Sequence, residues 1–256
     1  MKIMKKFLSI MAILLLIGAA GLAFEMEAHA EETKTVIALG ADLSAEQKAT
    51  VLGLMGITEE QLAGCEVIYI TNDQEHQYLD SYLGSSVIGS KSLSSVMLKK
   101  GTKGSGVNVT TKNINYCTTG MYRNALLTAG IQDTEVIVAA PTQISGTAAL
   151  IGAVKAYEKM EATTIPDAAL SSALNELITT GQLADAVKDV NGDEIEGLIA
   201  YIKEKVANGE LETEADMKAA IEEGAQKFGV TLSKEEIQKI VDLMNKLKGM
   251  GLDSEY

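Results

Sequence analysis

The 256-residue chain has no tryptophan, a single arginine (Arg123), two histidines, two cysteines and two prolines. Nucleic-acid binders need clustered Lys and Arg to neutralise phosphates, and aromatic rings to stack on bases. Here the net charge is −13 and only 4% of the residues are aromatic. The composition therefore excludes nucleic acid as a partner.

The N-terminal 30 residues have the pattern of a secretory signal peptide. Lys2, Lys5 and Lys6 precede an apolar run over residues 7–23, and Ala28-His29-Ala30 is a small-x-small cleavage site. A retained membrane anchor is the alternative, but the apolar run is short for a span. We expect cleavage after residue 30 and an extracytoplasmic, secreted protein. No later run of 18 apolar residues exists, so no transmembrane segment is expected after cleavage.

Residues 31–162 alternate between strand and helix patterns and are predicted to form an α/β domain. The βαββαβ order from residue 66 onward matches a ferredoxin-like, or split βαβ, arrangement, preceded by an extra N-terminal βα unit. The fold class is therefore α+β. The predicted strands are Val36–Leu39, Glu66–Thr71, Leu93–Lys99, Val107–Ile114 and Glu135–Ala140.

Several local features of this domain are specific enough to test. Ser44 and Gln47 form a capping box for a helix that should end at Gly56. The apolar runs 67–70 and 136–138 are typical of central strands covered on both faces, which predicts that the side chain of Ile137 is buried. The glycine-rich segment 101–106 is predicted to be a flexible hairpin turn.

Residues 163–256 form an acidic, purely helical region. Apolar residues recur there at helical spacing in four stretches, which predicts four short amphipathic helices. Such helices are not stable alone, so they must pack on each other or on the α/β domain.

Five sequence blocks resemble a known family. They are VIALGADLSAEQ from residue 36, YITNDQEHQYL from 69, SSVMLKKGTKGSGVNVTTKNINYCT from 94, MYRNALLTAGI from 121 and VAAPTQISGTAALIGAVKAYE from 138. Together they resemble the YpuA-like family of secreted bacterial proteins of unknown function. The resemblance implies secretion and the α/β core, and it implies no catalytic residues.

The two cysteines, Cys65 and Cys117, are candidates for a disulfide or for a reactive thiol. Cys65 precedes one predicted strand and Cys117 follows another, and in a ferredoxin-like sheet these two strands are adjacent and antiparallel. An oxidising compartment then favours a Cys65–Cys117 disulfide. Two inert free thiols are the alternative, and a third is a Cys117 nucleophile activated by the helix that follows it. His76 is expected at the opposite edge, too far to act as its base.

One loop is the strongest candidate for a ligand site. Residues 141–147 run from the end of a predicted strand into a helix N-terminus, an arrangement that binds small anions or carboxylates. Helix capping by Ser145 and Thr147 explains the same residues. The candidate ligand-binding residues at this edge are Thr118, Thr119, Thr142, Ser145 and Thr147.

No motif identifies a reaction or a cofactor. The segment 189–193 begins like a calcium loop, but Glu194 and Ala200 occupy positions where that loop needs glycine and a bidentate glutamate, so a turn is preferred and no metal is predicted. G-x-S-x-G, H-E-x-x-H and C-x-x-C are all absent. We therefore expect a non-enzymatic interaction or accessory module at the cell envelope, with an envelope protein as partner. An extracellular enzyme or small-ligand binder is the alternative.

Overall fold

A computed structural model describes residues 34–187 and 192–249. The described chain begins with β1 (Thr35–Gly40), α2 (Ala45–Met55), α3 (Glu59–Leu62), β2 (Glu66–Ile70), α4 (Asn72–Leu79) and α5 (Ser85–Ile88). It continues with β3 (Ser95–Lys100), β4 (Val107–Ile114), α6 (Thr119–Thr128), β5 (Thr134–Ile144) and α7 (Thr147–Glu161). The helices α8 (Asp167–Ala186), α9 (Gly192–Ala207), α10 (Glu214–Phe228) and α11 (Lys234–Lys248) follow. The predicted α+β class with a helical C-terminal region is confirmed.

The five strands form one mixed sheet in the order β2-β1-β3-β5-β4. The pairs β1–β2 and β4–β5 are parallel, and β3 is antiparallel to both β1 and β5. The expected ferredoxin-like strand order is therefore wrong. It would place β2 beside β4, whereas the structure places these strands at opposite edges. The segment 101–106 is likewise not a hairpin turn, because β5 separates β3 from β4.

The physical reason is the burial of β1. Its residues Val36, Ile37, Ala38 and Leu39 are at most 1% exposed. Four consecutive apolar residues can be shielded from water only where the strand is covered on both faces, which requires an interior position in the sheet. Once β1 takes that position beside β3, β2 is left at the edge.

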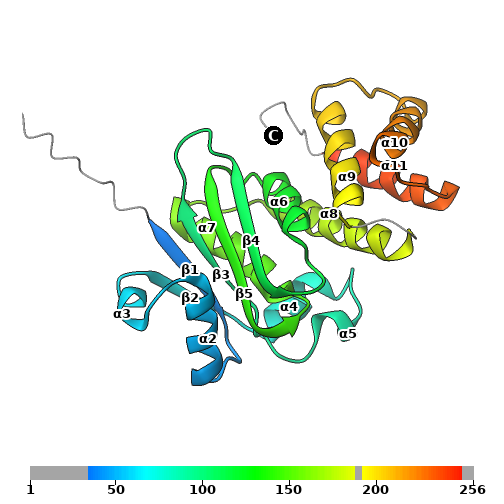
Figure 1. Cartoon of the computed structure of the whole chain (residues 1–256). Helices are drawn as coiled ribbons and strands as arrows, with labels where there is room; N and C mark the ends of the chain where they lie inside the picture. Colours follow the sequence, from blue (N-terminus) through cyan, green and yellow to red (C-terminus); the bar gives the residue numbers. More distant parts are fainter. Residues whose placement is uncertain (1–33, 188–191, 250–256) are drawn as a thin grey trace, which may run out of the picture. The chain divides into compact units, whose positions relative to one another are not determined.

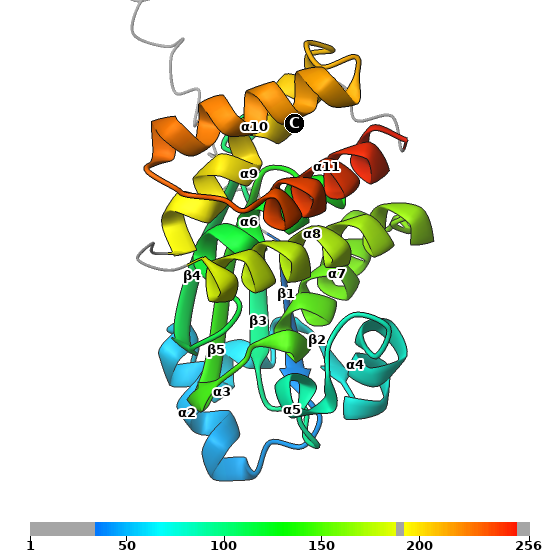
Figure 2. The ribbon, with the colours of Figure 1, turned by 90° about the vertical axis from the view of Figure 1, so that its right-hand side faces the viewer.

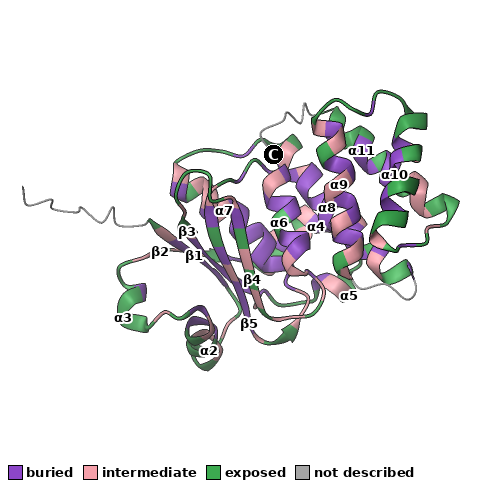
Figure 3. Ribbon diagram, turned by 45° about the horizontal axis from the view of Figure 1, so that its top comes forward, coloured by how far each residue is buried: buried purple, intermediate pink, exposed green. Residues whose placement is uncertain are grey.

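The predicted central position of the run 67–70 is wrong for the same reason. In β2 only Ile70 is buried, and Tyr69 is 56% exposed. Ile137 is half-buried rather than buried, while its neighbours Val136 and Val138 on the other face of β5 are fully buried. Figure 3 shows the buried residues concentrated along the sheet and the helices packed on it.

Helices cover both faces of the sheet (Figure 1). On one face, α2 and α3 pack against Ile37, Leu39 and Met97. On the other, α4, α6, α7 and the first half of α8 pack against alternate strand residues that include Val36 and Val96. The α2 helix begins with the predicted capping box of Ser44 and Gln47 and ends at Gly56.

The C-terminal helices form a second apolar cluster. Leu183 and Val187 at the end of α8 pack with residues of α9, α10 and α11, whereas Leu170 to Ile178 of the same helix belong to the core beside the sheet. Figure 2 shows α8 lying between α7 and α11. One continuous helix thus contributes to both clusters. None of the helices in the described residues is long and apolar enough to cross a bilayer.

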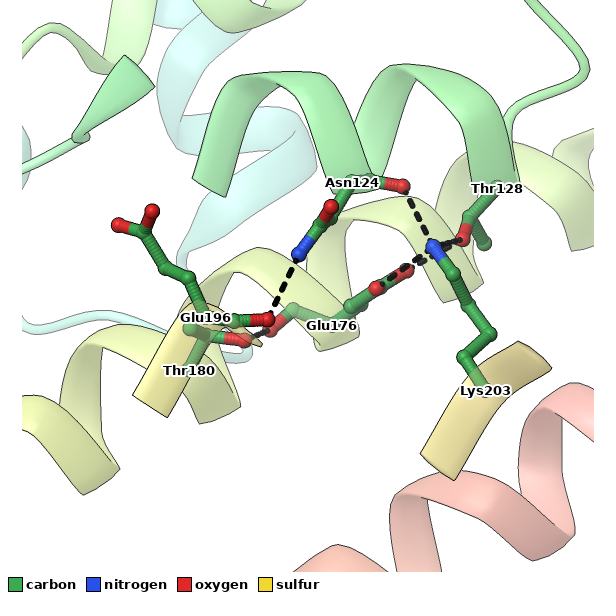
Figure 4. Close-up of polar contacts among 6 residues, drawn as sticks. All are labelled: Asn124, Thr128, Glu176, Thr180, Glu196 and Lys203. Carbon is green, nitrogen blue, oxygen red and sulfur yellow. Dashed lines mark hydrogen bonds and ion pairs between the residues drawn. The ribbon is translucent and has the colours of Figure 1, made fainter. Parts of the chain in front are cut away.

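Buried polar contacts also join α6, α8 and α9 (Figure 4). The Lys203 ammonium lies 2.9 Å from the Glu176 carboxylate and donates to the Asn124 carbonyl oxygen and the Thr128 hydroxyl. The Thr128 hydroxyl in turn donates to Glu176. The lysine and the carboxylate are therefore both compensated in the interior.

Candidate functional site

One cavity lies at the end of the sheet where β3 begins. Because β1, β2, β4 and β5 run in one direction, they all end at the edge where β3 begins. A cavity of about 490 Å³ opens there. Ligands of open sheets with helices on both faces bind outside the carboxyl ends of the strands. The residues that line the cavity are Glu75, residues 86–91, Leu93, Ser94, Asn115, Tyr116, Ile144, Ser145 and Thr147.

Glu75 is the most unusual group in this lining. It lies on α4 and is 1% exposed. The Thr147 hydroxyl donates to its Oε1 at 2.7 Å, and the Asn72 amide donates to its Oε2 at 3.4 Å. Burial raises the pKa of the Glu75 carboxyl, and the hydrogen bonds from Thr147 and Asn72 partly offset that rise. The cavity wall therefore holds a buried carboxyl whose pKa is raised.

The N-terminus of α7 forms an adjacent part of the wall. Its N-cap is Gly146, with φ of 94°, a left-handed conformation that favours glycine. Glycine has no side chain with which to cap this helix, so capping by Ser145 and Thr147 is wrong. Instead the Ala149 N–H donates to the Ser94 hydroxyl, and the hydroxyls of Ser145 and Thr147 lie 3.3 Å apart.

Backbone hydrogen bonds hold the loop after β4 against the end of β5. The Asn115 N–H donates to the Ile144 carbonyl at 2.9 Å, and the Cys117 N–H donates to the Ser145 carbonyl at 3.0 Å. These bonds place the Asn115 and Tyr116 side chains along the cavity. Burial raises the pKa of Tyr116 to about 12, so its hydroxyl stays protonated at neutral pH. Lys91 supplies an exposed ammonium at the mouth.

Comparison with known proteins places the chain in a family. Residues 39–256 match a family described as "Protein of unknown function (DUF1002)". The chain belongs to this family. It is also 39% identical over 219 residues to the "Uncharacterized protein YpuA" of Bacillus subtilis (strain 168), a match covering 85% of this chain and 73% of that protein. The resemblance to the YpuA-like family is thereby confirmed. No solved structure matches the chain.

The family match begins at Leu39, near the end of β1, and extends through the C-terminal helices. The cavity residues from Glu75 to Thr147 all lie within the matched range. The family description carries no activity, so the chemistry of the site rests on its residues.

The structure separates the five candidate ligand residues into two groups. Ser145 and Thr147 line the cavity, whereas Thr118, Thr119 and Thr142 are not among its lining residues. Thr118 is the N-cap of α6 and donates to the Glu196 carboxyl. The Thr119 hydroxyl lies 3.2 Å from that of Thr111. Thr142 is exposed on β5, because that strand continues through Pro141 to Ile144 instead of ending at Ala140.

The two cysteines lie apart, and the predicted disulfide is wrong. Both are free thiols. Cys65 packs beside α2 and α3 on one face of the sheet, while Cys117 is buried in the core on the other face. The disulfide prediction assumed that β2 and β4 are neighbours, and three strands separate them.

Cys117 is also not an activated nucleophile. Burial raises the pKa of the Cys117 thiol to about 12, the opposite of the lowering that the following helix was expected to cause. The histidine is engaged elsewhere: His76 Nδ1 lies 2.6 Å from Asp80 and its Nε2 lies 3.2 Å from the Gly89 carbonyl oxygen. The segment considered as a calcium loop falls largely on residues 188–191, outside the described residues.

Sequence reasoning missed Glu75, Ser94 and Asn115. Each follows or precedes a strand at the edge that holds the cavity, so a correct strand order would have indicated them. The sequence showed polar residues directly after the predicted strands, but the ferredoxin-like strand order placed them at opposite ends of the sheet. The signal was present locally, and the missing information was which strands are neighbours.

Proposed function

We propose that this protein is an exported, non-enzymatic binding module of the cell envelope. It holds a small polar ligand in the cavity at the end of the sheet where β1, β2, β4 and β5 end. The observation that carries the proposal is the buried Glu75 carboxyl in the wall of a cavity of about 490 Å³. A buried carboxyl is costly unless it is compensated, and such groups concentrate at functional sites.

The remaining lining supports a polar ligand. The lining includes residues with hydroxyl, amide and ammonium groups together with apolar residues; the polar ones are Ser86, Ser90, Lys91, Ser94, Asn115 and Ser145. Hydroxyls and amides donate and accept hydrogen bonds, so they recognise neutral polar groups as well as carboxylates. A few polar groups within an apolar lining are typical of small-molecule sites.

Binding is favoured over catalysis by the lining itself. The residues around the cavity include neither histidine nor cysteine. An extracellular enzyme is the second candidate, because a carboxyl of raised pKa in a cavity also suits a general acid. Turnover of a bound compound that is lost in Glu75→Gln, with binding retained, would establish that candidate.

Export rests on the N-terminal pattern. The lysines, the apolar run over residues 7–23 and the Ala28-His29-Ala30 site occur in the order that signal peptidases require. N-terminal sequencing of the protein recovered outside the cells should begin at Glu31. Recovery of a chain with residues before Ala28 intact would contradict export with cleavage.

The ligand site is tested by filling the cavity. Purified protein is screened by thermal shift and calorimetry against free amino acids, short peptides, monosaccharides and small dicarboxylates. We expect one class to raise the melting temperature. Ser86→Trp, which projects a large ring from a lining residue, should abolish that shift. Its neighbour Ser85 does not line the cavity, so Ser85→Trp should retain it.

Native mass spectrometry of freshly purified protein provides a second readout, because a tightly held ligand co-purifies. Binding that survives Ser86→Trp would move the site away from this cavity. Failure of every probe class, together with the absence of any co-purified small molecule, would contradict the proposed ligand-binding function.

A further inference from the structure

The strand β2 has one free edge. It pairs with β1 over five residues from Glu66 to Ile70, and no other described strand pairs with it. A groove of about 360 Å³ follows this edge, between β2 and α7, and its lining includes Ile68, Tyr69, Lys155 and Lys159. Unpaired backbone groups along an edge are a ready template for another strand.

The opposite edge of the sheet is protected, and β2 is not. β4 carries Lys112 among threonines and asparagines, and its pairing with β5 is interrupted by an irregularity at Lys112–Ile114, where Asn113 has φ of 60°. Lysine side chains and bulges are the devices that keep edge strands from pairing. β2 has the sequence EVIYI, without lysine, proline or a bulge.

An exposed tyrosine marks the same strand. Tyr69 is 56% exposed, and it is the one large apolar side chain classed as exposed among the described residues. Val67 and Ile68, which lie on opposite faces of the strand, are only half-buried. The free edge of β2 therefore combines unpaired backbone groups with an exposed aromatic side chain, which makes it available to a further strand.

We propose that β2 pairs antiparallel with β2 of a second copy of this chain, about a two-fold axis at Ile68, joining two five-stranded sheets into one. In that register Ile68 lies opposite Ile68 of the second copy, and Tyr69 lies opposite Val67 of the second copy. Aromatic and β-branched residues form favourable cross-strand pairs. The strand is thus complementary to itself, as a two-fold interface demands.

The charges along the groove also suit a second copy. Lys159 pairs with Glu66 at the start of β2, at 3.5 Å, and Lys155 pairs with Glu158 at 3.0 Å on the same helix. Both signs therefore lie along the groove. A two-fold axis brings the start of one strand to the end of the other, so neither copy opposes only like charges.

The test uses the mature protein in sedimentation equilibrium over a concentration series. Wild type should show a monomer–dimer equilibrium. Tyr69→Lys adds a charge to the edge without altering the core and should weaken the dimer by about tenfold or more. Thr110→Lys makes the matched change at an exposed position of β4 and should leave the dimer unaffected.

A cross-link tests the register independently. Cys65→Ser with Ile68→Cys places one thiol on the proposed axis, and oxidation should give a covalent dimer; Cys65→Ser with Thr110→Cys should not. A wild-type monomer at every concentration, or a dimer that both lysine variants weaken equally, would overturn the proposal. Capture of an unrelated extended peptide by a monomer, blocked by Tyr69→Lys, would also overturn it and assign the edge to a different partner.

Discussion

Lys203 on α9 places its Nζ 2.9 Å from Oε1 of Glu176 on α8, with 7% and 0% of the two side chains exposed. The Asn124 carbonyl and the Thr128 hydroxyl, both on α6, accept further hydrogen bonds from the same ammonium. The ion pair thus lies where α6, α8 and α9 meet. Because both charged groups have hydrogen-bond partners, the cost of burying the ion pair is offset.

Removing one partner of this pair should be strongly destabilising. We expect Lys203→Met to lower the free energy of unfolding by about 3–5 kcal/mol, because Glu176 is left buried without a counter-charge. Urea denaturation followed by circular dichroism measures this. The double variant Lys203→Met with Glu176→Met should recover much of the loss. A single variant as stable as wild type would show that the pair is not buried in solution.

An exposed pair provides the control for that experiment. Lys218 lies 2.6 Å from Glu214 with 43% and 54% of the side chains exposed. Exposed ion pairs contribute little, so Lys218→Met should change the free energy of unfolding by no more than about 0.5 kcal/mol.

Glu196 should make the stability depend on pH. Burial and the nearby charge of Asp193 raise its pKa to about 7, against the opposing charge of Arg123. Between its unfolded pKa near 4.5 and about 7, the folded state binds more protons than the unfolded state, so stability falls as pH rises through this window and then levels off.

The matched variant isolates this effect. Glu196→Gln cannot ionise, so its stability relative to wild type should increase from pH 4.5 to pH 8 by up to about 3 kcal/mol. Glu75 also has a raised pKa, but it is present in both proteins and cancels in the comparison. Parallel stability curves of the two proteins over this pH range would contradict the assignment to Glu196.

Two helical glycines should respond in opposite directions to alanine. A Cβ at Gly152 of α7 would lie 2.9 Å from the Ala38 Cβ and 3.1 Å from a Val96 methyl, so the helix contacts the sheet through this glycine. Gly152→Ala should cost about 1–3 kcal/mol through overpacking. Gly53 of α2 faces open space, and Gly53→Ala should stabilise by up to about 1 kcal/mol. Thermal unfolding of both variants is the measurement.

The cysteines should differ sharply in reactivity. Cys117 is fully buried with its thiol pKa raised to about 12, whereas Cys65 is partly exposed. Titration with a chromogenic disulfide reagent should therefore modify one thiol per native chain, and two in denaturant. A native chain without any reactive thiol, but with two after reduction, would restore the Cys65–Cys117 disulfide.

The sequence by itself determined the local features of this protein. The capping box at Ser44, the end of α2 at Gly56, the four C-terminal helices α8 to α11 and the family resemblance all depend on neighbouring residues or on patterns along the chain. Helix caps and helical periodicity act within a few residues, so the sequence carries them directly.

The tertiary structure alone decided which strands are neighbours, and the candidate site follows from that choice. The strand EVIYI has the apolar pattern of a central strand, yet β1, whose apolar run is equally long, takes the interior position because both its faces are covered by helices. That arrangement separates Cys65 from Cys117 and brings Glu75 to Thr147, 72 residues apart. Strand pairing depends on the packing of both sheet faces at once, and no local pattern along the chain encodes it.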